Sequence, residues 1–330
     1  MIVRYIIQRL LYAIPTLVFI SIVSFIIIQL PPGDFVDYIM AEMANDASRL
    51  DADYEAQLRK ELGADKPIYI QYLSWMKGVL VGDFGVSFMW NRPVNEIIWE
   101  RLSYTLLIAF VSLIFTYLLA IPVGIYAATH QYSFGDYTLT FLGFIGVATP
   151  NFLLALVLIW IFHQYFGISI GGLFSPEFYD QPWSFAKFLD FISHLWVPII
   201  VVGTAGTAWL IRIMRGTLMD ELRQQYVMTA RAKGVSESRL LYKYPVRMAL
   251  VPIISVIGWQ LPEMISATVI TSVVLSLPTI GPIFLKALSG QDMFLAGSIV
   301  LILSSLTVFG NFVSDILLVI VDPRIHFESN

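Results

Sequence analysis

Six long stretches with almost no charge constrain what this chain can fold into. They are Leu10–Gly33, Leu102–Gly135, Tyr137–Pro176, Phe191–Ile211, Met248–Leu285 and Met293–Val321. Only Glu263 and Asp315 interrupt them. A helix needs about 20 apolar residues to cross the hydrocarbon core of a bilayer. Charged residues make up 13% of the chain, whereas soluble domains carry roughly 25%. We therefore predict an all-α membrane protein with six transmembrane helices, the first of them an uncleaved anchor.

The basic residues of the short connections predict the orientation. With six helices, both chain ends lie on one side of the membrane. That side also receives the loop Arg212–Arg247, which holds eight Lys/Arg against three Asp/Glu. The short connections on the other side hold only Lys187 and Lys286. We expect the chain ends and this basic loop to lie in the cytoplasm.

The segment Pro31–Ser103 is then extracytoplasmic, and its pattern predicts a folded, partly helical region. A first helix is expected between Ser48, a possible N-cap, and Gly63, a glycine stop. A second helix is expected directly after Pro67. The letters GDFG at Gly82–Gly85 are read as a turn, because the other motifs of a kinase are missing. The expected organisation is 1–30 with the first helix, 31–103 outside, and 104–330 as a five-helix core containing the loop 212–247.

The basic loop itself predicts two helices joined by a glycine turn. Asp220–Lys233 contains strong helix formers, and Gly234 can adopt the positive φ of a helix end. Ser236 is a possible N-cap for a second helix that ends at Pro245. The charge of the loop has three explanations: it enforces topology, it binds anionic lipid, or it docks another protein.

The stretch YVMTARAKGVSESRLL resembles the cytoplasmic signature of the membrane subunits of binding-protein-dependent ABC importers, in the version typical of dipeptide and oligopeptide permeases. Gly234 aligns with the glycine of that signature. Further motifs match in order along most of the chain, including LPPGD, LGADKPIYIQYLSWMKGVLVGDFGVS, IPVGIYAA and DPRI. Two stretches depart from the family pattern: VITSVVLSLPTIGP and WQLPEM. They lie near the expected solute route, so oligosaccharides remain an alternative cargo to peptides.

This resemblance implies a fold, partners and functional residues. The fold would be that of a type I ABC importer transmembrane domain. The partners would be a second homologous permease subunit, two ABC ATPases that bind ATP and Mg, and an extracytoplasmic solute-binding protein. A short coupling helix would dock on one ATPase, with Arg231 and Lys233 pairing with its acids. The residues expected to couple to the ATPase are Tyr226, Met228, Thr229, Ala230, Arg231, Ala232, Lys233 and Gly234.

Four polar or aromatic residues inside the apolar stretches are candidates for the solute pathway: Asn151, Trp259, Gln260 and Glu263. A carboxylate within a bilayer is costly, so Glu263 should face a cavity or a protein partner. Its alternative role is to hold helices together as a neutral or paired side chain. Pro150, next to Asn151, has two explanations as well: a kink for packing, or a wall of the pathway.

The sequence excludes several kinds of chemistry. There is no cysteine, the four histidines are scattered without ligand spacing, and no G-x4-G-K-[ST] motif is present. The chain therefore should not be an enzyme, and it should hold no metal or cofactor. Its net charge of −4 gives no reason to expect nucleic acid. The rival hypotheses are an intramembrane enzyme that uses Glu263 and a stand-alone channel or carrier.

Overall fold

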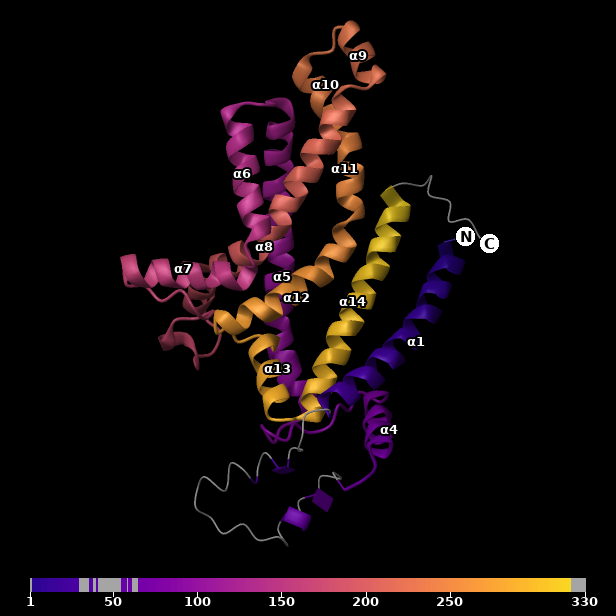
Figure 1. Cartoon of the computed structure of the whole chain (residues 1–330), viewed down its shortest axis with the longest axis vertical. Helices are drawn as coiled ribbons and strands as arrows, with labels where there is room; N and C mark the ends of the chain where they lie inside the picture. The colour runs from indigo at the N-terminus through magenta and orange to yellow at the C-terminus, as the bar shows by residue number, and fades with distance from the viewer. Residues whose placement is uncertain are drawn as a thin grey trace. The chain divides into compact units, whose positions relative to one another are not determined.

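The computed structural model describes residues 2–29, 36–37, 40, 55–57, 59–60 and 65–321 (Figure 1). Every named element in these residues is a helix, and one isolated bridge joins Val86 to Pro93. The helices are α1 (Ile2–Ile28), α4 (Ile68–Val79), α5 (Val94–Thr129), α6 (Phe134–Ala148), α7 (Asn151–Phe166), η1 (Pro176–Phe178), α8 (Phe185–Leu222), α9 (Gln225–Ala232), α10 (Glu237–Lys243), α11 (Pro245–Ser255), α12 (Ile257–Val274), α13 (Ile280–Ser289) and α14 (Met293–Val321). The prediction of an all-helical fold is confirmed.

Three of these helices are long and apolar enough to cross a membrane: α5, α8 and the Met293–Ile316 part of α14. Two helix pairs meet the same criterion when each pair counts as one bent span, which raises the number to five in the described residues. The bends are 106° between α6 and α7, and 51° between the α10–α11 helices and α12. The described apolar part of α1, Leu11–Ile27, is shorter. All six predicted apolar stretches are thus largely helical, and two of them are broken.

The sharper break lies at Thr149–Pro150. α6 ends at Ala148, Thr149 is extended, and Pro150 directly precedes α7. A proline lacks the backbone N–H of a helical hydrogen bond and disfavours helical geometry in the residue before it. Figure 1 shows α7 running across the direction of α6. A packing kink was one expectation for Pro150, but the change of direction is large enough to end one helix and begin another.

The chain divides into two compact units, the first made of Met1–Tyr104 and Thr279–Val308. In this unit α4 packs on α1: the hydroxyl oxygens of Tyr72 and Ser21 lie 2.8 Å apart. The ring of Phe25 stacks on Trp75 with 5.8 Å between ring centroids. The helix predicted after Pro67 is confirmed, whereas the one predicted from Ser48 to Gly63 lies mostly outside the described residues.

The residues after the Gly82–Gly85 turn are tied to the start of α14 by one carboxylate. Asp292 accepts the hydroxyl of Ser87 at 2.6 Å and the backbone N–H of Met89 at 3.1 Å. It also accepts the backbone N–H of Leu295 at 3.1 Å. An aspartate just before a helix satisfies N–H groups that have no partner within the helix. This part of the predicted extracytoplasmic segment is therefore folded.

The second unit comprises Thr105–Pro278 and Phe309–Asn330. Its core lies where α8 packs against α5 and α11, around the buried side chains of Leu210, Met214 and Ile253. A Cβ atom at Gly124 of α5 would lie 2.5 Å from the Cβ of Met214, so this close approach requires glycine. Asp136, in the first turn of α6, accepts two hydrogen bonds of 2.8 Å from Arg215 of α8.

The connection between α7 and α8 is folded around Lys187. The sequence places this lysine in a short loop, but the structure places it in the first turn of α8, where it is 6% exposed. Its ammonium donates to the backbone carbonyl of Tyr179 at 3.3 Å and to that of Gln181. The ammonium also lies 4.9 Å from the centroid of the Phe174 ring. Carbonyl oxygens and an aromatic face thus compensate for removing this charge from water.

Candidate functional site

The basic loop forms a helical hairpin, here called the loop hairpin (Gln225–Lys243), at one end of α8 and α11 (Figure 1). The single helix predicted over Asp220–Lys233 is wrong in one respect. α8 ends at Leu222, and α9 begins at Gln225 after an extended Gln224. The predicted single helix is therefore divided between the end of α8 and α9, because the chain turns at the end of α8. The second predicted helix is present as α10, and Pro245 begins α11.

Gly234 forms the turn of the loop hairpin with a φ of +77°. Its backbone N–H donates to the carbonyl of Arg231 at 3.0 Å, and the next N–H, from Val235, donates to the carbonyl of Ala230 at 3.3 Å. These bonds satisfy carbonyls at the end of α9. A Cβ atom at this position would meet nothing within 4 Å. Glycine is needed here for its conformation and not for space.

Arg231 and Glu237 close the turn from both sides. The guanidinium Nη2 lies 2.9 Å from Oε2 of Glu237, and its Nε bonds the other carboxylate oxygen. The hydrogen bonds from Arg231 hold the pKa of the Glu237 carboxyl below its usual value. The resemblance suggests that Arg231 pairs with acids of another protein. In this structure its guanidinium instead binds the carboxylate of Glu237 in its own chain. Lys233 is exposed and has no ion pair among the described residues.

The predicted coupling residues line the outer surface of the loop hairpin. All of them except the half-buried Ala230 are exposed. Between them, Val227 is fully buried, which the sequence analysis did not predict. Tyr226 donates a hydrogen bond to the carboxylate of Glu221. Burial, followed by this hydrogen bond, raises the pKa of the Tyr226 hydroxyl above its ordinary value. The hairpin is a defined surface that another protein can contact.

The three candidates on α12 do not share one environment. Gln260 is 1% exposed and lies in the packing between α12 and α8. Trp259 is 41% exposed, and its ring meets Trp209 of α8 edge to face at 5.1 Å between ring centroids. Glu263 is exposed and has no hydrogen bond or ion pair among the described residues. Trp259 and Glu263 are therefore available to a solute or partner, whereas Gln260 is not.

Asn151 stands apart from this group in its structural role. It is the first residue of α7, directly after the break at Pro150, and it is half-buried. Its side chain makes no hydrogen bond within the part of the chain that the structure describes. The residue thus marks the bend, and no described polar contact joins it to Trp259 or Glu263.

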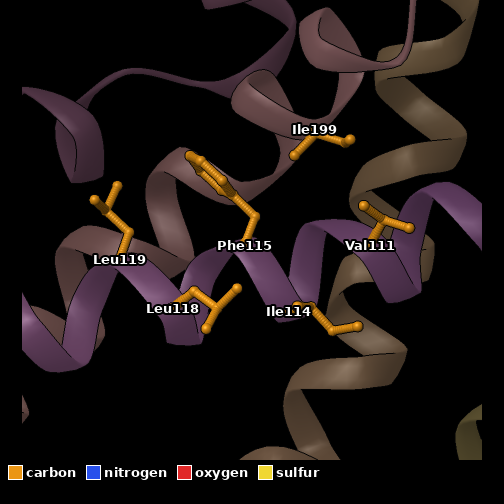
Figure 2. Close-up of a pocket in the computed structure, with 6 residues that line it drawn as sticks. All are labelled: Val111, Ile114, Phe115, Leu118, Leu119 and Ile199. Atoms are coloured by element: carbon orange, nitrogen blue, oxygen red, sulfur yellow. The ribbon is translucent and has the colours of Figure 1, made fainter. Parts of the chain in front are cut away.

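An apolar hollow of about 380 Å³ lies on the side of α5 (Figure 2). The residues that line it are Val111, Ile114, Phe115, Leu118, Leu119 and Ile199. None of these side chains carries a group that could orient a polar solute, and the surface suits hydrocarbon. We do not assign it to the candidate functional site.

No group of three or more His, Cys, Asp or Glu side chains is placed to hold a metal ion among the described residues. Of the four histidines, 130, 163 and 194 lie in this part of the chain, and His326 lies outside it.

Comparison with known proteins gives two family matches. Residues 120–327 match the family described as binding-protein-dependent transport system inner membrane component, and residues 2–109 match the N-terminal region of such a membrane component. The oligopeptide transport system permease protein AppB of Bacillus subtilis (strain 168) is 37% identical, over 98% of this chain and 99% of AppB. The dipeptide transport system permease protein DppB of Escherichia coli (strain K12) is 30% identical, over 98% of this chain and 99% of its own.

The fold is similar to that of a solved transporter. The MetNI methionine ABC transporter, solved in inward facing conformations, matches with a TM-score of 0.53 at 16% identity. The match covers 69% of this chain and 96% of the other. At this identity the likeness concerns the fold alone.

Proposed function

The chain belongs to the family of binding-protein-dependent transport system inner membrane components, and we propose that it forms half of a translocation pathway driven through the loop hairpin. It is a multi-pass permease subunit of the inner membrane and has no catalytic role of its own. Transporters of this kind work with ATPase subunits and a binding protein. The remaining questions are how this chain engages them and what it carries.

The observation that carries the proposal is the exposed loop hairpin. Its turn is fixed by Gly234 and by the Arg231–Glu237 pair, so a force on α9 is transmitted as displacement of a defined unit. Val227 of α9 is fully buried, so this side of the helix is packed within the chain. We propose that an ATPase groove receives the exposed face of α9, and that closure of the ATPases tilts the membrane helices. Tyr226, Met228, Thr229 and Lys233 would make the contact, with Ala230, Ala232 and Gly234 allowing close approach.

The proposed assembly contains two permease halves. The second half would be a related but different chain, and each half would dock one ATPase, which binds ATP and Mg. A solute-binding protein would deliver the cargo from outside. In this arrangement the chain ends are cytoplasmic and residues 31–103 are extracytoplasmic. The first helix lies in residues 1–30, and the core is 104–330.

Peptides are the proposed cargo. The relatives named as oligopeptide and dipeptide permeases match over nearly their whole length, which favours the same solute class. Oligosaccharides are the alternative, because the stretches WQLPEM and VITSVVLSLPTIGP depart from the pattern of peptide permeases. Asn151, Trp259 and Glu263 are proposed to lie along the pathway, and Gln260 to support its wall.

Site-specific photocrosslinking in the assembled transporter tests the docking proposal. Met228 is 61% exposed on α9, and Trp160 is 59% exposed on α7, so the two positions form a matched pair. A photoreactive side chain at Met228 should trap the ATPase, whereas the same group at Trp160 should not. Capture of the ATPase only from Trp160 would contradict the assignment of α9. ATP-dependent uptake of a tripeptide and of a trisaccharide by the same preparation separates the two cargo classes.

A further inference from the structure

One face of α12 carries an exposed carboxylate in a helix with no other charged residue. Trp259, Glu263, Ser266 and Ile270 are exposed along it, and their spacing places them on one side of a helix. The exposed residues at the start of α7 are apolar by contrast: Phe152, Leu153, Leu156 and Val157. A carboxylate exposed to lipid is costly. The face that carries Glu263 is therefore the one that meets water or another protein.

The packing between α8 and α12 builds the aromatic part of this face. A Cβ atom at Gly206 of α8 would lie 2.6 Å from the terminal methyl carbon of Met264, so the two helices meet closely there. Gln260 is buried beside the same contact. This approach brings Trp209, one turn after Gly206, against Trp259 in an edge-to-face pair tilted by 79°. Trp209 was not predicted as a site residue from the sequence, because only the folded structure places it against Trp259.

Glu263 follows Trp259 by four residues on the same helix. Side chains at this spacing lie about 5–6 Å apart at Cβ. α12 carries no other charged residue, so no neighbouring cation on this helix compensates the carboxylate. A negative charge one helical turn from Trp259, whose ring meets that of Trp209, is the chemistry that recognises an ammonium group, since the faces of tryptophan rings attract cations within about 6 Å.

We propose that Glu263, Trp259 and Trp209 form a subsite in the pathway that holds the ε-ammonium group of a lysine side chain in the cargo. The inference rests on the proposed function, and it narrows the cargo to solutes that bring a cation to this face, such as a peptide with a lysine side chain. A neutral sugar could only donate hydrogen bonds to Glu263, which would leave the carboxylate charge uncompensated. The subsite would act on passage through the membrane, after the binding protein has released the cargo.

The experiment uses the complete transporter in proteoliposomes, with its ATPases and binding protein. The probes are two tripeptides of similar shape, Ala-Lys-Ala and Ala-Met-Ala, and the quantity measured is the ratio of their ATP-driven uptake rates. Because the same binding protein serves every variant, its own preference cancels. Trp259→Leu should lower the Lys/Met ratio by about fivefold, the size expected of a cation–aromatic contact that is partly desolvated, and Glu263→Gln, which removes the charge that attracts the ammonium, should lower it at least as much. Trp209→Leu should lower it in the same direction.

Two variants control the interpretation. Glu263→Asp keeps the charge and should retain the wild-type preference, and Ser266→Ala changes the same face without changing its charge. ATPase stimulation by loaded binding protein reports assembly for each variant independently of cargo choice. An unchanged Lys/Met ratio in Glu263→Gln and Trp259→Leu, with peptide uptake intact in the wild type, would overturn the subsite and leave the peptide transporter standing. A wild-type transporter that takes up neither peptide would overturn the proposed cargo as well.

Discussion

The guanidinium of Arg231 and the carboxylate of Glu237 form a two-point ion pair across the glycine turn of the loop hairpin. It joins the end of α9 to the start of α10 and is solvent-exposed. An exposed ion pair adds little to global stability, so we expect it to act by holding the angle between the two short helices. This assigns Arg231 to the shape of the hairpin and leaves Lys233 as the basic residue of the turn that is available to a partner's acids.

Exchange of the two charges distinguishes an internal role of Arg231 from an external one. Arg231→Glu alone should place two acids face to face, open the turn and reduce substrate-stimulated ATPase activity several-fold. The double variant Arg231→Glu/Glu237→Arg should recover most of that activity, because the pair forms again with its polarity reversed. If the double variant assembles but does not recover activity, the internal role of Arg231 is wrong and a direct contact with the ATPase is supported. Lys233→Glu should remain impaired in either background.

Substitution of Gly234 tests the left-handed turn. An L-residue in this conformation costs roughly 1–2 kcal/mol, and a β-branched residue is disfavoured more strongly. Gly234→Val should therefore uncouple ATP hydrolysis from uptake while the protein remains inserted. Gly216→Ala in α8 is the matched control, because a Cβ atom there also meets nothing within 4 Å but the residue is helical. Normal coupling in Gly234→Val would disprove the role of the turn.

The Asp136–Arg215 pair should contribute more to stability than an exposed pair. Asp136 is 2% exposed and also accepts the backbone N–H of Tyr132 at 3.0 Å. Asp136→Asn leaves Arg215 without its counter-ion and should destabilise the protein by about 1–3 kcal/mol. Thermal unfolding in detergent measures this as a lowered Tm. The control is Arg92→Gln, which breaks the exposed pairs with Glu96 and Glu100 and should change the Tm little.

Labelling with an impermeant thiol reagent tests the proposed orientation in this cysteine-free chain. Lys77 is exposed on α4, and Ser238 is exposed on α10. Lys77→Cys should react in intact spheroplasts, and Ser238→Cys only after the membrane has been opened. The opposite pattern would invert the topology. Reaction of both positions in intact spheroplasts would indicate a leaky preparation. A known cytoplasmic protein with an exposed cysteine, which should stay unlabelled, controls for this.

The length of the stretches without charged residues predicted the apolar helices well, because a helix in the hydrocarbon core of a bilayer must be apolar over that length. The same criterion did not predict the 106° bend after α6. A proline raises the chance of a break, but whether the helix kinks or restarts is decided by the residues packed around it, here α8 along α6. Gly234 was predictable since its positive φ is a local property of the chain. Trp209 was not predictable, because its contact with Trp259 joins residues far apart in sequence. That contact depends on the close approach of α8 and α12 at Gly206.

The exposure of individual residues was the least predictable property. Gln260, Trp259 and Glu263 lie within five positions of one another, yet the first is buried and the other two are exposed. Helical spacing fixes which residues share a side, but only the neighbouring helix fixes which side is covered. Lys187 was expected in a short loop but is buried. Its burial depends on carbonyls and aromatic rings that the α7–α8 connection folds around it.

The break after α6 has a consequence for biosynthesis. α6 contains 15 residues and α7 contains 16, and each is shorter than the roughly 20 residues that span a bilayer core. Neither helix alone offers the insertion machinery a full-length membrane segment, whereas the two together do. The nascent chain would therefore enter the bilayer with both halves treated as one segment. The bend at Pro150 would then be acquired afterwards, when α8 arrives and packs along α6.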